Sequence, residues 1–191
     1  LCVGCERRHS KAGLAALTQR TSTVQTINAK AHFVSPPEAK LYTSGFAISL
    51  EAGLSACELD PTLIAIGLGS APNSDGELEL DASMMDGSDL SAGAVCAVRG
   101  IVPVISVARK VMEDTPHVML AGEQARRFAI EKGFQPRNLM TANNIEKFND
   151  WKSGKSEAGY VHSTAESHDT VTMIGLETLE DGTPHLVSAS S

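Results

Sequence analysis

The stretch Ser-His-Asp-Thr-Val-Thr-Met-Ile-Gly, residues 167–175, decides how the rest of this sequence is interpreted. A short polar segment ends at Asp169, and a run of β-branched and apolar residues starts at Thr170. By composition alone, Thr170 is an ordinary strand residue, because a β-branched side chain suits a pleated sheet. The alternative is that the chain is cut before Thr170. Its hydroxyl and its freed α-amine would then act together as nucleophile and base.

The segments on either side of this stretch predict a flexible linker followed by a β-hairpin. Residues 171–176 and 185–189 have strand character, and Glu-Asp-Gly at residues 180–182 forms the turn between them. Residues 152–169 are polar and contain several Ser, Gly and Lys, which predicts a mobile linker. A mobile linker suits a chain that is cut at its end, because the new C-terminus has to leave the site.

Upstream, residues 36–151 are expected to form a core of helices and strands, whereas residues 1–35 show no clear period and are expected to be disordered. Helices are expected at residues 38–58, 103–113 and 124–132. Strands are expected at residues 63–68, 77–85, 91–98 and 117–121. The strands within 77–98 should pair antiparallel, with the second buried on both faces. Only a helical turn, residues 147–151, is expected in the polar stretch that follows.

Composition excludes several classes of protein. The chain has 191 residues, of which 42% are hydrophobic and 20% charged, and its formal net charge is -7. This predicts one acidic globular domain, for which nucleic acid is not an expected partner. The sequence contains no run of about 18 apolar residues, so no membrane span is predicted. No signal peptide is visible either. Four cysteines do not make a disulfide scaffold. Cys2 and Cys5 lack a partner pair at zinc-finger spacing, so no metal is predicted.

Three blocks of sequence, in the same order as in the family, resemble the glycosylasparaginases, which are N-terminal-nucleophile hydrolases. His-Asp-Thr-Val-Thr-Met-Ile, residues 168–174, resembles their cleavage site. A second block runs from Gly-Ser-Ala-Pro-Asn at residues 69–73 to Met-Met-Asp-Gly at residues 84–87. A third runs from Gly-Ala-Val at residues 93–95 to Val-Ala-Arg-Lys-Val-Met-Glu at residues 107–113. The resemblance covers roughly residues 38–191.

This resemblance implies an α+β fold, the four-layer αββα sandwich of these hydrolases, in incomplete form. It implies self-cleavage between Asp169 and Thr170, with Thr170 then acting as the catalytic nucleophile on the side-chain amide of asparagine or of glycosylasparagine. L-asparaginase or isoaspartyl peptidase activity is the near alternative, and a non-catalytic fragment is a further one. The resemblance implies no cofactor, a homodimer of processed units, and a lysosomal or extracytoplasmic location. The sequence contains no N-glycosylation sequon that would independently indicate such a location.

The sequence also departs from the family. The usual Gly-Gly-Ser-Pro is Gly-Ser-Ala-Pro at residues 69–72, and the family's tryptophan loop is not reproduced near the start, because Trp151 is the only tryptophan. The second threonine and the substrate-binding Arg and Asp of the family are expected beyond Ser191. No substrate-binding residue is therefore predicted here, and residues 1–191 alone are expected to be poorly stable and to lack hydrolase activity.

Other polar and sulfur-containing residues have simpler interpretations. His168 either orients the Asp169 carboxylate or is solvated, and the sequence leaves both open. Asp81 and Asp86 are interpreted as turn formers, Arg99 and Arg109 as solvated side chains, Cys57 and Cys96 as buried thiols, and Met84, Met85 and Met173 as core residues.

Overall fold

The computed structural model describes residues 44–63, 66–155 and 170–191. The predicted N-terminal segment 1–35 and the predicted linker from residue 156 onward lie outside the described residues. His168 and Asp169 lie outside them as well.

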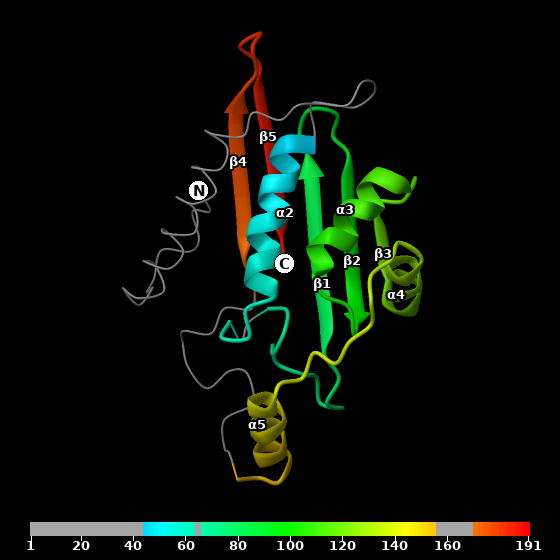
Figure 1. Cartoon of the computed structure of the whole chain (residues 1–191), viewed down its shortest axis with the longest axis vertical. Coiled ribbons are helices and arrows are strands. Elements are labelled where there is room, and N and C mark those ends of the chain that lie inside the picture. Colours follow the sequence, from blue (N-terminus) through cyan, green and yellow to red (C-terminus); the bar gives the residue numbers. More distant parts are fainter. Residues whose placement is uncertain (1–43, 64–65, 156–169) are drawn as a thin grey trace, which may run out of the picture.

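A five-stranded sheet, in the order β3-β2-β1-β5-β4, forms the centre of the fold (Figure 1). Its strands are β1 (Glu79–Asp86), β2 (Ala92–Arg99), β3 (Met119–Ala121), β4 (Thr172–Thr178) and β5 (Pro184–Ser190). All neighbours are antiparallel except β2 and β3, which are parallel. The hairpin β4–β5 joins the earlier strands because β5 pairs with β1, from Ser83 opposite Ser190 to Asp86 opposite Val187. The two predicted strand pairs therefore belong to one sheet.

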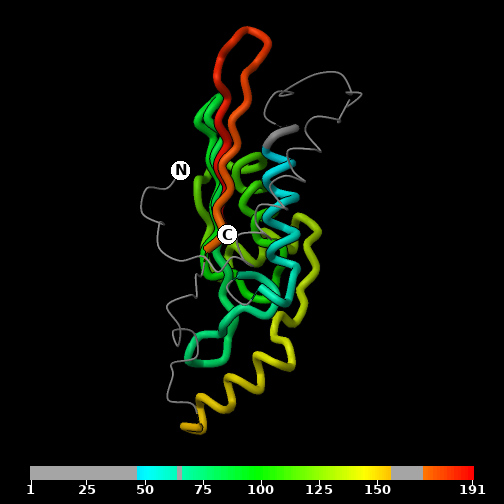
Figure 2. Tube along the Cα trace, turned by 90° about the vertical axis from the view of Figure 1, so that its left-hand side faces the viewer, coloured from blue at the N-terminus to red at the C-terminus, as the bar shows by residue number. Residues whose placement is uncertain are grey.

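Among the residues described, helices cover one face of this sheet, and a further helix lies at one end of the molecule (Figures 1 and 2). They are α2 (Ser44–Glu58), α3 (Val104–Asp114), α4 (Gly122–Glu131) and α5 (Ala142–Lys152). Helix α2 packs on the hairpin, α3 on β1 and β2, and α4 on β2 and β3. The described part of the chain is thus a mixed α+β fold with a helix layer and a sheet layer.

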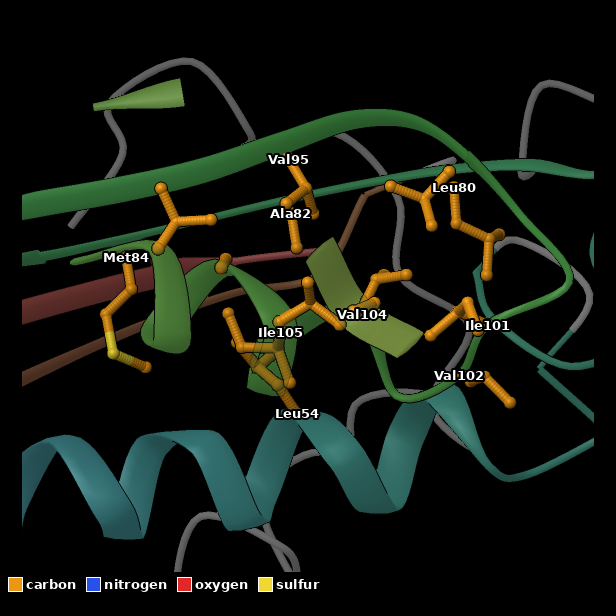
Figure 3. Packing of buried hydrophobic residues seen from close by; sticks show 14 of the residues in the cluster. Leu54, Leu80, Ala82, Met84, Val95, Ile101, Val102, Val104 and Ile105 are labelled. Atoms are coloured by element: carbon orange, nitrogen blue, oxygen red, sulfur yellow. The ribbon is translucent and has the colours of Figure 1, made fainter. Parts of the chain in front are cut away.

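The core lies between these two layers. The apolar stripe of α3 includes Val104, Ile105, Val107 and Val111, each 0% exposed. Figure 3 shows Leu54 of α2 and Ile105 of α3 lying between helix and sheet, with strand residues such as Met84 and Val95 facing them. Burying one such side chain stabilises the fold by about 1.5–3 kcal/mol, so this stripe is what holds α3 on the sheet.

Gly93 lets the backbone of α3 approach β2 directly. A Cβ atom at Gly93 would lie 2.2 Å from the carbonyl oxygen of Ala108 and 2.4 Å from the amide nitrogen of Met112. Both are helix backbone atoms, which cannot turn aside as a flexible side chain does. The close contact between α3 and β2 therefore depends on the absence of a side chain at residue 93.

The other face of the sheet carries no helix among the residues described. Large apolar side chains are exposed there: Met85 is 41% exposed, Ile174 59%, Leu176 67% and Leu186 48%. We call these four residues the open apolar face. The prediction that Met85 fills the core is wrong, because residues of β1 alternate and Met84 takes the buried side. Likewise, β2 is not buried on both faces, since residues facing away from the helices are only half-buried.

Two further predictions need correction. The described residues of the predicted strand 63–68 form turns and bends, because Gly67, with φ +64°, folds the chain back and Leu68 donates a backbone hydrogen bond to the Glu58 carbonyl. The predicted helical turn at 147–151 is part of the longer helix α5, whose N-terminus is capped by the Thr141 side chain. In the described ranges, none of the helices combines the length and apolar character that crossing a bilayer requires.

Candidate functional site

Thr170 lies at the point where the hairpin begins. Its side chain is exposed, and the first paired residue of the hairpin follows it directly. Val171 donates a backbone hydrogen bond to the Ser191 carbonyl at 2.8 Å, and the Ser191 amide donates one to the Val171 carbonyl at 3.0 Å. The residue after Thr170 is therefore held through both its backbone amide and its backbone carbonyl. This fixes the backbone next to the predicted nucleophile while leaving its hydroxyl accessible.

The side chains next to Thr170 on the sheet are polar. The Thr172 and Ser190 hydroxyls lie 3.0 Å apart across the β4–β5 ladder, and Ser83 of β1 pairs with Ser190 on the other side. All three face away from the helices, because the residues between them face the helices. Thr170 precedes Thr172 by two residues and so continues the same side of the strand. The hydroxyls thus make a polar end next to the open apolar face.

On the helix side of the sheet, Glu58 is a fully buried carboxyl that sequence reasoning missed. It is the last residue of α2 and is 0% exposed. Its Oε2 accepts a hydrogen bond from the Val104 amide at 2.5 Å, and its Oε1 accepts one from the Ile105 amide at 3.0 Å. These amides are unpaired donors at the start of α3, where Pro103 offers no side-chain cap. Glu58 therefore caps a helix that comes much later in the sequence.

Burial raises the pKa of Glu58 to about 7, although hydrogen bonds from the Ser191 side chain and from the Ile105 and Val104 amides act to lower it. Burial has the larger effect because a charged carboxylate loses its hydration in the core. Glu51 on the same helix also raises the pKa of Glu58, by repulsion between like charges. The Glu58 carboxyl accordingly titrates near neutral pH.

At the far end of the hairpin, His185 bridges two carboxyl groups. Its Nε2 lies 2.9 Å from Asp86 Oδ1 and its Nδ1 lies 2.7 Å from Glu177 Oε1. His185 and Asp86 are 1% and 0% exposed at the side chain, whereas Glu177 is 40% exposed. Burial lowers the pKa of His185, but the hydrogen bonds to Glu177 and Asp86 outweigh it and hold that pKa above the usual 6.5. This cluster connects β1, β5 and β4.

The interpretation of Asp86 as only a turn former is incomplete. Asp86 Oδ1 does accept hydrogen bonds from the Ser88 amide at 2.8 Å and the Ser88 hydroxyl at 2.6 Å, as a turn residue would. It is also fully buried and bonded to His185, and its Oδ2 has no hydrogen-bond partner in the described ranges. A buried carboxylate of this kind needs the positive charge of His185 beside it.

Replacing His185 with leucine is expected to destabilise the fold by about 3 kcal/mol at pH 6, because the buried Asp86 carboxylate would lose its cation. A raised pKa means that the stabilisation from protonated His185 is complete below about pH 6.5 and is lost as the pH rises through the folded-state pKa. The loss in unfolding free energy caused by His185→Leu should therefore shrink at pH 9. Urea unfolding at both pH values measures it.

The control for this experiment is Glu177→Gln, which removes the charge of the half-exposed partner and keeps hydrogen-bonding groups. It is expected to change the unfolding free energy by about 1 kcal/mol or less. An equal loss for His185→Leu at pH 6 and pH 9 would show that His185 contributes packing alone.

The remaining predicted polar residues are structural. Arg99 is exposed, as predicted, and forms ion pairs with Glu79 and Glu77. Arg109 is not solvated: only 18% of its side chain is exposed, and it pairs with Glu51 at 2.5 Å and Glu113 at 2.7 Å.

Asp81 is not a turn former but accepts a hydrogen bond from the Ala97 amide at 2.7 Å, where the β1–β2 register shifts. Of the predicted buried thiols, Cys57 is buried and Cys96 is only half-buried. Among the described side chains, no group of three or more Asp, Glu, His and Cys has an arrangement that could hold a metal ion.

Comparison with known proteins gives a matching family and relatives whose names carry three activities: glycosylasparaginase, isoaspartyl peptidase and L-asparaginase. The family model described as Asparaginase matches residues 11–183. The chain is 40% identical over 129 residues to the N(4)-(beta-N-acetylglucosaminyl)-L-asparaginase of Elizabethkingia miricola, covering 68% of this chain and 37% of the relative. It is 46% identical over 109 residues to the isoaspartyl peptidase/L-asparaginase of Rattus norvegicus, covering 52% and 32%. It is 43% identical over 104 residues to a plant-type L-asparaginase of Pyrococcus horikoshii, covering 54% and 34%. The matched part of the chain spans about a third of the length of these curated relatives.

Proposed function

Because the chain belongs to the Asparaginase family of N-terminal-nucleophile hydrolases, we propose that it is part of a self-cleaving amidohydrolase with Thr170 as the nucleophile. The observation that carries this proposal is the position of Thr170. It is exposed at the head of β4, one residue before the reciprocal pair between Val171 and Ser191. A nucleophile has to be both accessible and held in place, and this position supports both requirements.

Self-cleavage would proceed in two steps. The Thr170 hydroxyl attacks the carbonyl carbon of Asp169, and the acyl group moves from the Thr170 nitrogen to its oxygen. In that shift the C–N bond breaks and the hydroxyl proton passes to the nitrogen, so the α-amine of Thr170 is freed. Water then hydrolyses the ester, which releases the Asp169 carboxylate and regenerates the Thr170 hydroxyl. An α-amine has a pKa of about 7.7 to 8.0, so a useful fraction is neutral near pH 7 and can accept the hydroxyl proton.

Amide hydrolysis would use the same hydroxyl. Thr170 Oγ attacks the side-chain amide carbon of the substrate, the α-amine takes the hydroxyl proton, and that proton passes to the leaving amine. The resulting aspartyl ester is hydrolysed by water, which regenerates Thr170 and releases aspartate. We propose glycosylasparagine as the substrate, since the relative with 68% coverage of this chain is a glycosylasparaginase by name. The isoaspartyl peptidase/L-asparaginase relatives favour asparagine and β-aspartyl peptides as the second candidates.

We also propose that the open apolar face is covered by a second sheet in the whole protein, giving the four-layer αββα sandwich. The support is the four exposed side chains Met85, Ile174, Leu176 and Leu186. Contiguous apolar surface of this kind marks a contact face. A second sheet at about 10 Å would bury it and would enclose the polar end beside Thr170.

The test is made on the full-length gene product that contains this chain. Intact-mass measurement should find two pieces, the second starting with Thr170. The processed protein is then supplied with glycosylasparagine, asparagine and a β-aspartyl dipeptide, and aspartate release is measured. The highest kcat/KM is expected for glycosylasparagine. A processed protein that releases aspartate from none of the three would overturn the proposed activity, and a higher kcat/KM for asparagine or the dipeptide would overturn the substrate assignment.

A further inference from the structure

Val171 is fixed to the rest of the fold by its backbone and by its side chain. Its amide and its carbonyl exchange hydrogen bonds with the backbone of Ser191, at 2.8 and 3.0 Å. Its side chain is half-buried and packs against the hydrophobic core, as the side chain of Met173 does. Thr170 and Thr172, which alternate with these two residues, have exposed side chains. The start of the hairpin therefore has an apolar side fixed in the core and an accessible hydroxyl side.

Few apolar side chains hold this strand on the helix layer, which is formed here by α2 (Figure 1). Gly175, the next residue on the helix side, has no side chain, and Glu177 after it bonds to His185 at 2.7 Å. In the described part of the chain, β4 is also the edge of the sheet and pairs with β5 alone. Val171 and Met173 therefore supply the apolar contacts on this side, and Val171 is the one next to the predicted nucleophile.

The proposed cut makes this anchorage more important. Before the cut, Thr170 is held by the chain on both of its sides. After the cut, Thr170 is a chain terminus, and a terminus frays unless it is tied down. The peptide plane between Thr170 and Val171 is rigid and contains the Cα atom of Thr170, so fixing the Val171 amide also fixes that Cα atom. The amine and the hydroxyl of Thr170 can then move only by rotation about the bonds to this Cα atom.

We propose that Val171 is a positioning residue for amide hydrolysis: packed in the core and paired with Ser191, it holds the free end of the processed chain so that the amine and the hydroxyl of Thr170 stay at the substrate. This inference rests on the proposed role of Thr170. Val171 faces away from the hydroxyl side of the strand, so it does not touch the substrate. Weakening its anchorage lowers the fraction of molecules in which the nucleophile is in place, which reduces kcat in proportion and leaves KM nearly unchanged.

The experiment compares Val171→Ala with Met173→Ala in the full-length protein that contains this chain. Intact mass gives the processed fraction, and kcat and KM for aspartate release from the best of the three proposed substrates are calculated per processed molecule. Val171→Ala is expected to lower kcat about tenfold and to change KM by about twofold or less. Met173→Ala removes a larger side chain from the same core, so it should lower the melting temperature at least as much but keep kcat within about twofold of the wild type. Val171→Ile keeps the anchor and should restore kcat.

The outcomes separate this inference from the proposed function. Suppose that the wild type is processed and active. If Val171→Ala then loses no more kcat than Met173→Ala does, or raises KM as much as it lowers kcat, the positioning role is wrong and Thr170 stands as the nucleophile. Should Val171→Ala fail to fold, Val171→Thr, which keeps the shape and weakens the apolar contact, is judged by the same comparison. If the wild type is not cut before Thr170, or releases no aspartate, the proposed function is wrong and the positioning role falls with it.

Discussion

Replacing Thr170 with alanine is expected to leave the full-length protein in one piece and to reduce amide hydrolysis by a factor on the order of 10⁴ or more. Alanine at this position has no oxygen to accept the acyl group from Asp169, so no free amine forms. Without that amine the site lacks both its nucleophile and its base. Intact-mass measurement detects whether the chain is cut, and the release of aspartate from glycosylasparagine measures the hydrolysis.

Thr172→Ala is the matched control for this prediction. Thr172 has the same side chain two residues further on, faces the same side of the sheet and contacts the Ser190 hydroxyl at 3.0 Å. It is expected to be cut at Thr170 and to remain active. Thr170→Ser retains a hydroxyl and should be cut more slowly but completely. Normal cutting and turnover by Thr170→Ala would show that another residue supplies the nucleophile.

Replacing Gly93 with valine is expected to lower the unfolding free energy by about 4 kcal/mol or more, which is a large part of the stability of a typical domain. The new Cβ would lie 2.2 Å from the Ala108 carbonyl oxygen and 2.4 Å from the Met112 amide nitrogen. Relief requires the whole of α3 to move away from β2, and this opens the core that its apolar stripe fills. Urea unfolding followed by circular dichroism measures the loss.

The control for Gly93→Val is Ala94→Ser, the neighbouring residue on the opposite face of β2, which is half-buried. Adding one atom there is expected to change the unfolding free energy by about 0.5 kcal/mol or less. If Gly93→Val proves as mild as the control, the contact between α3 and β2 is looser than the structure indicates.

Local patterns were enough to predict most of the elements around the site. Pro103 at the start of an apolar stripe predicted α3, and the turn at residues 180–182 predicted the hairpin, because both signals depend on neighbours in sequence. The pairing of β5 with β1 is non-local and has no such signal. The predicted strand at 63–68 failed for a related reason: a contact with the Glu58 carbonyl turns that segment, and apolar character alone does not reveal the contact.

The site residues divide in the same way. Thr170 and Asp169 were identified because their motif is contiguous, and their roles remain predictions. Glu58 was missed because its hydrogen-bond partners come from the start of α3, far away in the sequence. A helix that starts after Pro103 with no capping side chain nevertheless indicates that an acceptor comes from elsewhere. His185 had a signal too: it alternates with Val187 and Ala189 on the buried side of β5, where a polar residue requires partners.

The pairing of β5 with β1 also bears on the order of events in folding. Asp86 and Val187, which face each other in the ladder, are far apart in the chain, so this pairing closes a long loop and forms slowly compared with the helices and hairpins. Val171, the residue after Thr170, pairs with Ser191 at the end of β5, so a cut that requires Thr170 to be held there takes place only in a chain that has already assembled its sheet. Only molecules that had folded correctly would then carry a free amine at Thr170, and chains that misfold would stay both uncut and inactive.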